Sequence, residues 1–283
     1  KEGGGAAGGP AAAAAAATDG SVSAAFSALR DEGRCAVIPY LCAGDPSLEA
    51  TAEALVAADA NGADILELGV PYSDPLADGP VIQAAATRAL AGGAKLQGVI
   101  DMLAGVSPKL SAPVVLFTYY NPIIAYGARD FMAAAKAAGA SGLLVPDLPL
   151  EETDTMRALA EEAGLETVLL VTPTTPVERM AMIAEKTQGF VYLVSVAGVT
   201  GTRTTVATGV EGLIEQLRTV TDKPIAVGFG ISGGEQAKQV KEWGADGVIA
   251  GSAFVRALGE ASSAEEGVAK VGALAKELKD AVA

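Results

Sequence analysis

Residues 63–80, ADILELGVPYSDPLADGP, place a short apolar strand directly before a loop rich in glycine, proline and aspartate. The strand covers residues 65–68 and carries one acidic side chain, Glu67, in its middle. Burying a polar group without a partner costs on the order of 2–7 kcal/mol, and glutamate is seldom buried unless it is paired or used. Glu67 is therefore the first candidate for a catalytic side chain.

The loop after this strand adds two carboxylates, Asp74 and Asp78. A strand carboxylate that faces loop carboxylates suits acid–base chemistry, because burial favours the protonated form of one group while another stays ionised. The structural alternative is that each aspartate bonds its own backbone in a turn, Asp74 before Pro75 and Asp78 before Gly79. The spacing leaves both interpretations open.

The composition limits the class of protein. The chain has 283 residues, 50% of them hydrophobic, which is enough for one large α/β domain or two smaller ones. No apolar run approaches the roughly 18 residues of a membrane span. The formal net charge of −14 argues against a nucleic-acid partner. We therefore expect neither a membrane nor a nucleic acid among its partners.

The absence of histidine also restricts the chemistry. It removes Ser–His and Cys–His nucleophile pairs and the commonest metal ligand, so we expect no metal site. General acid–base work then falls to Glu, Asp, Tyr or Lys. The two cysteines, Cys35 and Cys42, flank a predicted strand and lie beyond disulfide reach. We expect both to be reduced residues in or near the core of an intracellular protein.

After residue 20 the sequence alternates between strand-like and helical patterns. Strands are predicted at 36–41, 65–68, 114–118, 142–145, 167–171, 190–194, 225–228 and 247–250. Helices are predicted at 21–33, 48–61, 81–90, 96–104, 128–138, 151–163, 176–186, 210–219, 234–243 and 264–282. Eight β-then-α units predict a single (β/α)8 TIM barrel over residues 21–283, with the extra N-terminal helix covering its bottom. A doubly wound open sheet is the alternative.

Residues 1–20, KEGGGAAGGPAAAAAAATDG, are Gly/Ala-rich and show no periodic pattern. We expect a leader that is disordered or loosely helical and lies outside the fold. The remnant of an organelle transit peptide is one explanation for it, and an added segment is another.

Active sites of TIM barrels lie where the strands end, so the residues after each strand are candidates. Residues 39–46, 117–122 and 145–149 follow the first, third and fourth strands and contain tyrosines, an asparagine and aspartates. The loop at 195–207 is long, small and polar, which is typical of a mobile lid. An ordinary connection is the alternative.

Two glycine loops follow the last two strands, GFGIS at 228–232 and AGSAF at 250–254. Glycine lets backbone N–H groups approach a ligand, and a short helix that follows aims its positive end at it. The two loops together match the recurrent phosphate site of TIM barrels, so we expect a small phosphate ester as substrate.

The remaining chemistry follows by elimination. Schiff-base cleavage needs a desolvated lysine at a strand end, whereas the lysines here fall on predicted helices or surface loops. A metal-assisted aldolase would usually need histidines. Proton transfer by carboxylates remains, and it suits a substrate that serves as its own electron sink.

Seven segments in order resemble the tryptophan synthase α subunit family: PYLCAGDP, ADILELGVPYSDPLADGPVIQ, FTYYNP, LLVPDLP, VYLVSVAGVTGTR, VGFGIS and GVIAGSAF. The resemblance covers about residues 36–255, and the block ELGVPYSDPLADGP is its most specific part. It implies retro-aldol cleavage of indole-3-glycerol phosphate to indole and glyceraldehyde 3-phosphate, with the indole ring as electron sink.

The resemblance also implies roles for single residues. Glu67 matches the glutamate that protonates C3 of the indole and takes the proton of the glycerol hydroxyl. Asp78 matches the aspartate that accepts from the indole N–H. The implied substrate-binding residues are Tyr40, Phe117, Tyr119 and Phe229 at the indole, Tyr192, Thr200 and Gly201 at the lid, and Gly201, Gly230, Gly251 and Ser252 at the phosphate.

The family usually works with a β subunit in an α2β2 complex. Asp74, Asn121 and Pro122 match its α–β contacts, the last two in a loop. Pyridoxal phosphate is implied in the β subunit alone, so we expect no cofactor in this chain. The segment SVAGVTG and the alanine-rich leader are more similar to a plant or algal version of the family than to the common bacterial one. This similarity predicts a location in the chloroplast stroma, and the cytoplasm is the alternative.

Two other functions fit the same residues. One is a stand-alone indole-3-glycerol-phosphate lyase of secondary metabolism, which would need no β subunit. The other is a non-catalytic barrel kept as an allosteric partner, which the presence of Glu67, Asp78, Thr200 and both phosphate loops disfavours.

Overall fold

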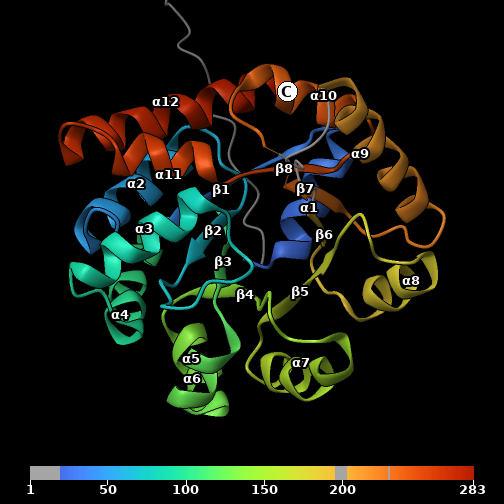
Figure 1. Cartoon of the computed structure of the whole chain (residues 1–283). Helices are drawn as coiled ribbons and strands as arrows, with labels where there is room; N and C mark the ends of the chain where they lie inside the picture. Colours follow the sequence, from blue (N-terminus) through green and yellow to red (C-terminus); the bar gives the residue numbers. More distant parts are fainter. Residues whose placement is uncertain (1–19, 195–202, 229) are drawn as a thin grey trace, which may run out of the picture.

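The strands form a closed parallel barrel (Figure 1). The computed structural model describes residues 20–194, 203–228 and 230–283, and of residues 203–208 the backbone alone. Each strand pairs with the next in sequence, and β8 closes the barrel on β1. The strands are β1 (Ala36–Cys42), β2 (Leu66–Gly69), β3 (Val114–Phe117), β4 (Ala140–Leu144), β5 (Glu166–Val171), β6 (Val191–Val194), β7 (Ile225–Gly228) and β8 (Gly247–Ala250). The predicted (β/α)8 barrel is confirmed, and the open sheet is wrong.

The helices other than α1 surround the barrel as an outer ring (Figure 1). The helices of the described residues are α1 (Val22–Asp31), α2 (Leu48–Ala60), α3 (Pro80–Ala91), α4 (Leu96–Val106), α5 (Tyr120–Tyr126), α6 (Ala128–Ala137), α7 (Thr153–Glu162), α8 (Val177–Lys186), α9 (Arg203–Arg218), α10 (Gly234–Glu242), α11 (Ser252–Gly259) and α12 (Ala264–Val282), with short 3-10 turns η1 (Ser107–Lys109) and η2 (Leu150–Glu152). Serine side chains cap three of them: Ser21, Ser47 and Ser263 each accept an N–H of the first turn.

Three helical predictions need correction. The predicted loop at 195–207 is too long, because α9 already begins at Arg203. The segment around Asn121 and Pro122 is not a loop but the first turn of α5, where proline is tolerated because the N–H it lacks has no partner within the helix. The predicted helix 151–163 is split, with η2 preceding α7.

The interior of the barrel is filled by alternate residues of the strands. Ile38, Ile65, Val115, Leu144 and Phe190 belong to one buried cluster inside it. The residues between them pack outward against the helices, as Val37 and Leu66 do. The pairing brings Tyr40 level with Glu67, and Glu67 level with Val115. Glu67 therefore points into the barrel, on the same side of the sheet as Val115.

Helix α1 closes one end of the barrel, as the sequence predicted. Figure 1 shows it inside the ring formed by the other helices. Its buried residues Val22 and Phe26 join the interior cluster, and the Phe26 ring lies 5.3 Å from that of Phe190. The apolar face of α1 thus seals the N-terminal ends of the strands and leaves their C-terminal ends for a site.

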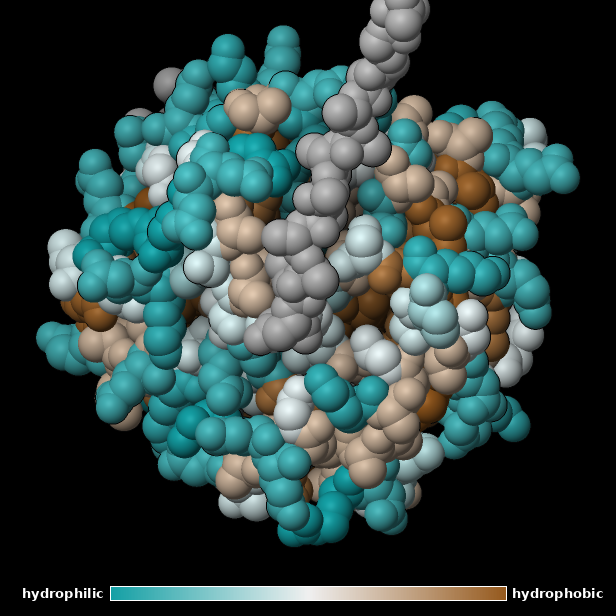
Figure 2. All heavy atoms as spheres, turned by 180° about the vertical axis from the view of Figure 1, so that it is seen from behind, coloured by the Kyte–Doolittle hydropathy of each residue, from teal (hydrophilic) through white to brown (hydrophobic). Residues whose placement is uncertain are grey.

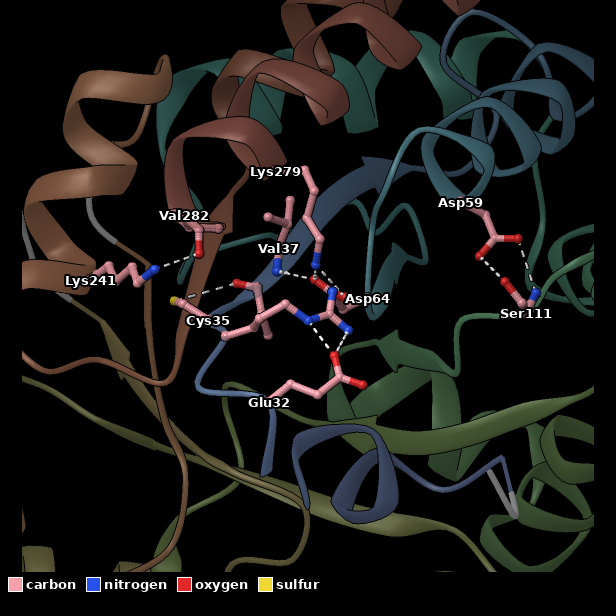
Figure 3. A network of polar contacts seen from close by, with 11 residues as sticks. Glu32, Cys35, Val37, Asp59, Asp64, Ser111, Lys241, Lys279 and Val282 are labelled. Carbon is pink, nitrogen blue, oxygen red and sulfur yellow. Dashed lines mark hydrogen bonds and ion pairs between the residues drawn. The ribbon is translucent and has the colours of Figure 1, made fainter. Parts of the chain in front are cut away.

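A partly buried ion pair holds the last helix against the first two strands (Figure 3). Lys279 of α12 donates to both carboxylate oxygens of Asp64, at 2.6 and 2.7 Å. Asp64 also accepts the backbone N–H of Val37 at 2.8 Å. Nearby, Lys241 of α10 donates to the carbonyl of Val282 at 2.9 Å. These contacts fix the C-terminal helix to the N-terminal side of the barrel.

Both cysteines are buried and free, as predicted. Burial raises the pKa of the Cys35 and Cys42 thiols to about 12. The two side chains therefore behave as small apolar groups at neutral pH.

The outer surface is largely polar on the face seen in Figure 2, with smaller hydrophobic patches. A groove of about 920 Å³ lies between α2 and α4 and is lined mainly by small and apolar residues, among them Ala52, Val56 and Met102. It lies on the outside of the barrel, away from Glu67. Among the described helices, none is both long and apolar enough to cross a membrane.

Candidate functional site

Glu67 is the second residue of β2 and is buried, with 2% of its surface exposed. Its Oε1 atom has no hydrogen-bond partner among the described residues. Burial, and next the nearby charge of Asp78, raise the pKa of Glu67 from its usual 4.5 to about 8. The side chain is therefore a carboxylic acid at neutral pH, with an unpaired oxygen inside the barrel. This arrangement is a candidate general acid.

Asp78 lies in the loop between β2 and α3 and interacts with Glu67. Burial raises the pKa of Asp78 to about 6, while the hydrogen bond from Tyr119 lowers it. The Tyr119 hydroxyl donates to Oδ2 of Asp78 at 3.1 Å and accepts the N–H of Ala77 at 3.0 Å. Asp78 is thus mainly a carboxylate at pH 7, so the two acids hold different protonation states.

The other loop acid does not join this pair. Asp74 is exposed, and its carboxylate accepts the hydroxyl of Ser73 at 2.6 Å. The expectation that Glu67 faces two loop carboxylates is therefore correct for Asp78 and wrong for Asp74.

Aromatic side chains surround the two carboxyl groups. The Tyr40 ring meets Phe117 edge-on at 5.6 Å, and Phe117 meets Tyr119 edge-on at 6.3 Å. Tyr192 rises from β6, and the negative charges of Glu67 and Asp78 add to the burial that raises the pKa of its hydroxyl. Four predicted site residues (Tyr40, Phe117, Tyr119 and Tyr192) thus lie around the same opening of the barrel.

Two glycines make room for these rings. A Cβ at Gly69 would overlap the Tyr40 hydroxyl, and one at Gly228 would lie 2.8 Å from the Tyr192 ring. Larger residues at either position would push the tyrosines out of the barrel mouth. The strand sequences ELG and AVG therefore place small residues where a side chain from the neighbouring strand leans across.

The described parts of the two phosphate loops lie at the ends of β7 and β8. Gly251 is the N-cap of α11, Ser252 is its first residue, and a Cβ on Gly251 would lie 3.9 Å from Cβ of Tyr40. The first N–H groups of α11 have no partner within the helix and can bind an anion. Gly230 follows β7 with a φ of +38°, a conformation that favours glycine. Phe229, Thr200 and Gly201 lie outside the described residues.

The three predicted contact residues of a partner lie on the β2–α3 loop and on α5. Asp74 and Asn121 are exposed, and Pro122 is partly exposed. Asn121 donates to the Tyr72 hydroxyl at 3.0 Å, which joins the two segments. Each segment also exposes a large apolar residue, Leu76 at 92% and Ile124 at 52%. Such exposure is typical of a surface that is covered in an assembly.

Sequence reasoning missed three residues of the site. Leu144 lies level with Phe117 in the pairing of β3 and β4, and Leu170 lies level with Tyr192 on β5 and β6. Both extend the apolar wall, and the alternation of inward residues along the predicted strands could have identified them. The third is Tyr72, whose ring stacks on Tyr119 at 5.1 Å. No local signal in the sequence distinguishes it.

Known proteins resemble this chain in sequence and in fold. The sequence model described as "Tryptophan synthase alpha chain" matches residues 26–283. The chain belongs to this family. The tryptophan synthase alpha chain of Rippkaea orientalis is 57% identical over 262 residues, which cover 93% of this chain and 98% of that protein. The tryptophan synthase alpha chain of Arabidopsis thaliana is 55% identical over 261 residues, which cover 92% and 95%.

Solved structures of the family share the fold. A chain of Mycobacterium tuberculosis tryptophan synthase superposes with a TM-score of 0.83 at 38% identity, covering 92% of this chain and 97% of that one. The resemblance inferred from the seven sequence segments is therefore confirmed over nearly the whole barrel.

Proposed function

We propose that this chain acts as a tryptophan synthase α subunit and cleaves indole-3-glycerol phosphate to indole and glyceraldehyde 3-phosphate. The observation that carries the proposal is the pair of carboxyl groups in the barrel mouth. Glu67 is protonated at neutral pH because its pKa is raised to about 8, whereas the pKa of Asp78 stays near 6. Family membership supports the same reaction.

Glu67 carries the proton transfers in this proposal. Its carboxylic acid protonates C3 of the indole, which leaves an electron-poor iminium across C2 and N1. The resulting Glu67 carboxylate then takes the proton of the hydroxyl on the adjoining glycerol carbon. The carbon–carbon bond breaks, its electron pair restores the indole ring, and the glycerol carbon becomes the aldehyde. Glu67 ends protonated, so the cycle is balanced.

Asp78 stabilises the charge that develops on the ring. Its carboxylate accepts the indole N–H, so a positive charge on that nitrogen meets a negative one. Tyr119 keeps Asp78 in place through the 3.1 Å hydrogen bond. Tyr40, Phe117, Tyr119 and Phe229 line the indole ring in this proposal. Tyr192, Thr200 and Gly201 are the contacts on the lid side, and Gly201, Gly230, Gly251 and Ser252 bind the phosphate through backbone N–H groups.

A β subunit is the proposed partner, in an α2β2 complex. The support is the exposed pair Leu76 and Ile124 beside Asp74, Asn121 and Pro122, which lie on the segments that the family resemblance assigns to the contact. Pyridoxal phosphate would belong to that subunit, and this chain would work with its own side chains. The chloroplast stroma is the proposed compartment, supported by the similarity to the Arabidopsis thaliana protein, and localisation of a fluorescent fusion tests it.

The deciding experiment measures indole release from indole-3-glycerol phosphate by the purified chain, alone and with excess β subunit. We expect slow turnover that rises sharply when β is added. Fast turnover that ignores β would favour the stand-alone lyase, and no indole in either case would refute the reaction.

Two variants test the roles of the carboxyl groups. Glu67→Gln should remove indole release, and Asp78→Asn should lower turnover by about 10²–10⁴-fold while the phosphate is still bound. Unchanged indole release by Glu67→Gln would refute the mechanism. Loss of phosphate binding in Asp78→Asn would mean that Asp78 is structural. For the wild type, kcat/KM should peak between pH 6 and 8, because Asp78 must be ionised and Glu67 protonated in the free enzyme.

A further inference from the structure

Tyr72 lies in the same loop as Asp78 but does not touch it in any described contact. Its ring stacks on Tyr119, with centroids 5.1 Å apart and planes 30° apart. Its hydroxyl accepts the side-chain amide of Asn121 at 3.0 Å. The ring is therefore fixed at two points, by the face of Tyr119 and by the first turn of α5.

Tyr119 is the side chain that needs such support. Its hydroxyl accepts the N–H of Ala77 at 3.0 Å, which directs the hydroxyl hydrogen to Oδ2 of Asp78 at 3.1 Å. The ring also meets Phe117 edge-on at 6.3 Å, and 2% of the surface of Tyr119 is exposed. A swing of the Tyr119 side chain about its Cα–Cβ bond would move the hydroxyl and lengthen both hydrogen bonds, and the stacked Tyr72 ring lies against such a swing.

We propose that Tyr72 is a positioning residue, which together with Asn121 holds Tyr119 in the orientation that bonds the Asp78 carboxylate. The contacts run without a gap from Asn121 to Tyr72, from Tyr72 to Tyr119, and from Tyr119 to Asp78. This inference rests on the proposed function of Asp78. In this proposal Tyr72 acts through Tyr119 on the Asp78 carboxylate, which accepts the indole N–H, and not by contact with the substrate.

The consequence is a change in the titration of Asp78. The hydrogen bond from Tyr119 lowers the pKa of Asp78, against the burial that raises it. If Tyr119 turns away, the pKa rises further, and the acid limb of the pH profile moves to higher pH. Besides Tyr119, four titratable groups interact with Asp78 from the packed elements and would stay in place in such a variant: Glu67, Tyr40, Cys42 and Tyr192.

Kinetics of four variants test the proposal. Tyr72→Phe removes the bond to Asn121 and keeps the stack, Tyr72→Ala removes both, and Tyr119→Phe removes the bond to Asp78. We expect kcat to fall about tenfold in Tyr72→Ala, the lower end of the worth of one hydrogen bond to a charged group, with less loss in Tyr72→Phe and little change in KM. The acid limb of the pH profile should move to higher pH, and more so in Tyr72→Ala than in Tyr72→Phe. Tyr126→Phe, which removes the hydroxyl that bonds Gln97, is the matched control and should behave as wild type.

The double variant Tyr72→Ala/Tyr119→Phe separates positioning from a general structural role. If Tyr72 acts through Tyr119, the double variant should match Tyr119→Phe alone in kcat and in the acid limb. Additive losses, or a lower kcat with an unshifted acid limb, would overturn the proposal.

A second measurement does not depend on turnover. Titration of the Asp78 carboxyl by ¹³C NMR, assigned with Asp78→Asn, should show a higher midpoint in Tyr72→Ala than in wild type. An unchanged midpoint would refute the inference even if indole release is normal. Absence of indole release from the wild type, with the NMR shift present, would refute the proposed function and leave the positioning role standing.

Discussion

Replacing Glu67 by glutamine is expected to stabilise the protein at neutral pH, because burial disfavours the ionised form of the Glu67 carboxyl. The folded-state pKa of about 8 stands against the usual 4.5. For an acid with a raised pKa, the stability it contributes is complete below pH 4.5 and is lost as the pH rises through 8. The buried carboxyl therefore lowers the free energy of unfolding by an increasing amount between pH 4.5 and pH 8.

The size of the effect follows from the two pKa values. At pH 5 the unfolded chain is already partly ionised, and this lowers the free energy of unfolding by about 1 kcal/mol. At pH 7 the unfolded chain is almost fully ionised while about nine in ten folded molecules hold the proton, and the loss reaches about 3 kcal/mol. Glutamine does not titrate. The stability of Glu67→Gln relative to wild type should therefore rise by about 2 kcal/mol from pH 5 to pH 7.

Urea unfolding at pH 5, 6 and 7 measures this difference. The single tryptophan, Trp243, packs against the core and reports the transition by its fluorescence. Glu215→Gln removes an exposed carboxyl from α9 and serves as control. Parallel pH dependences of Glu67→Gln and wild type would show that Glu67 is ionised in the folded chain. The argument for Glu67 as an acid would then fail.

Two further outcomes follow from the structure. Lys279→Met should lower the free energy of unfolding by about 2 kcal/mol in chemical denaturation, because it leaves the partly buried Asp64 carboxylate without its cation. Lys276→Met breaks an exposed pair and should cost under 1 kcal/mol, and equal losses would contradict the argument. Cys35 and Cys42 should resist a thiol reagent at pH 8 in the folded chain and react after unfolding, since burial raises the pKa of each thiol to about 12; rapid labelling of the native protein would show that these strands open.

The sequence by itself determined the barrel and its catalytic strand. Alternating strand and helix patterns fix the fold class, because each parallel strand needs a crossover before the next. Glu67 could be selected without a structure, since an acid within an apolar strand has few structural explanations. The two glycine loops could also be recognised from the sequence, because glycine loops after the last two strands of a barrel are typical of a phosphate site.

Only the tertiary structure decided how the acids are used. Asp74 and Asp78 look alike in the sequence, yet one is exposed and the other is half-buried beside Glu67. The bond that holds Asp78 comes from Tyr119, 41 residues away, and Tyr72 reaches Tyr119 only because two loops meet at the barrel mouth. Burial and distance set the two pKa values, and neither is a property of local sequence.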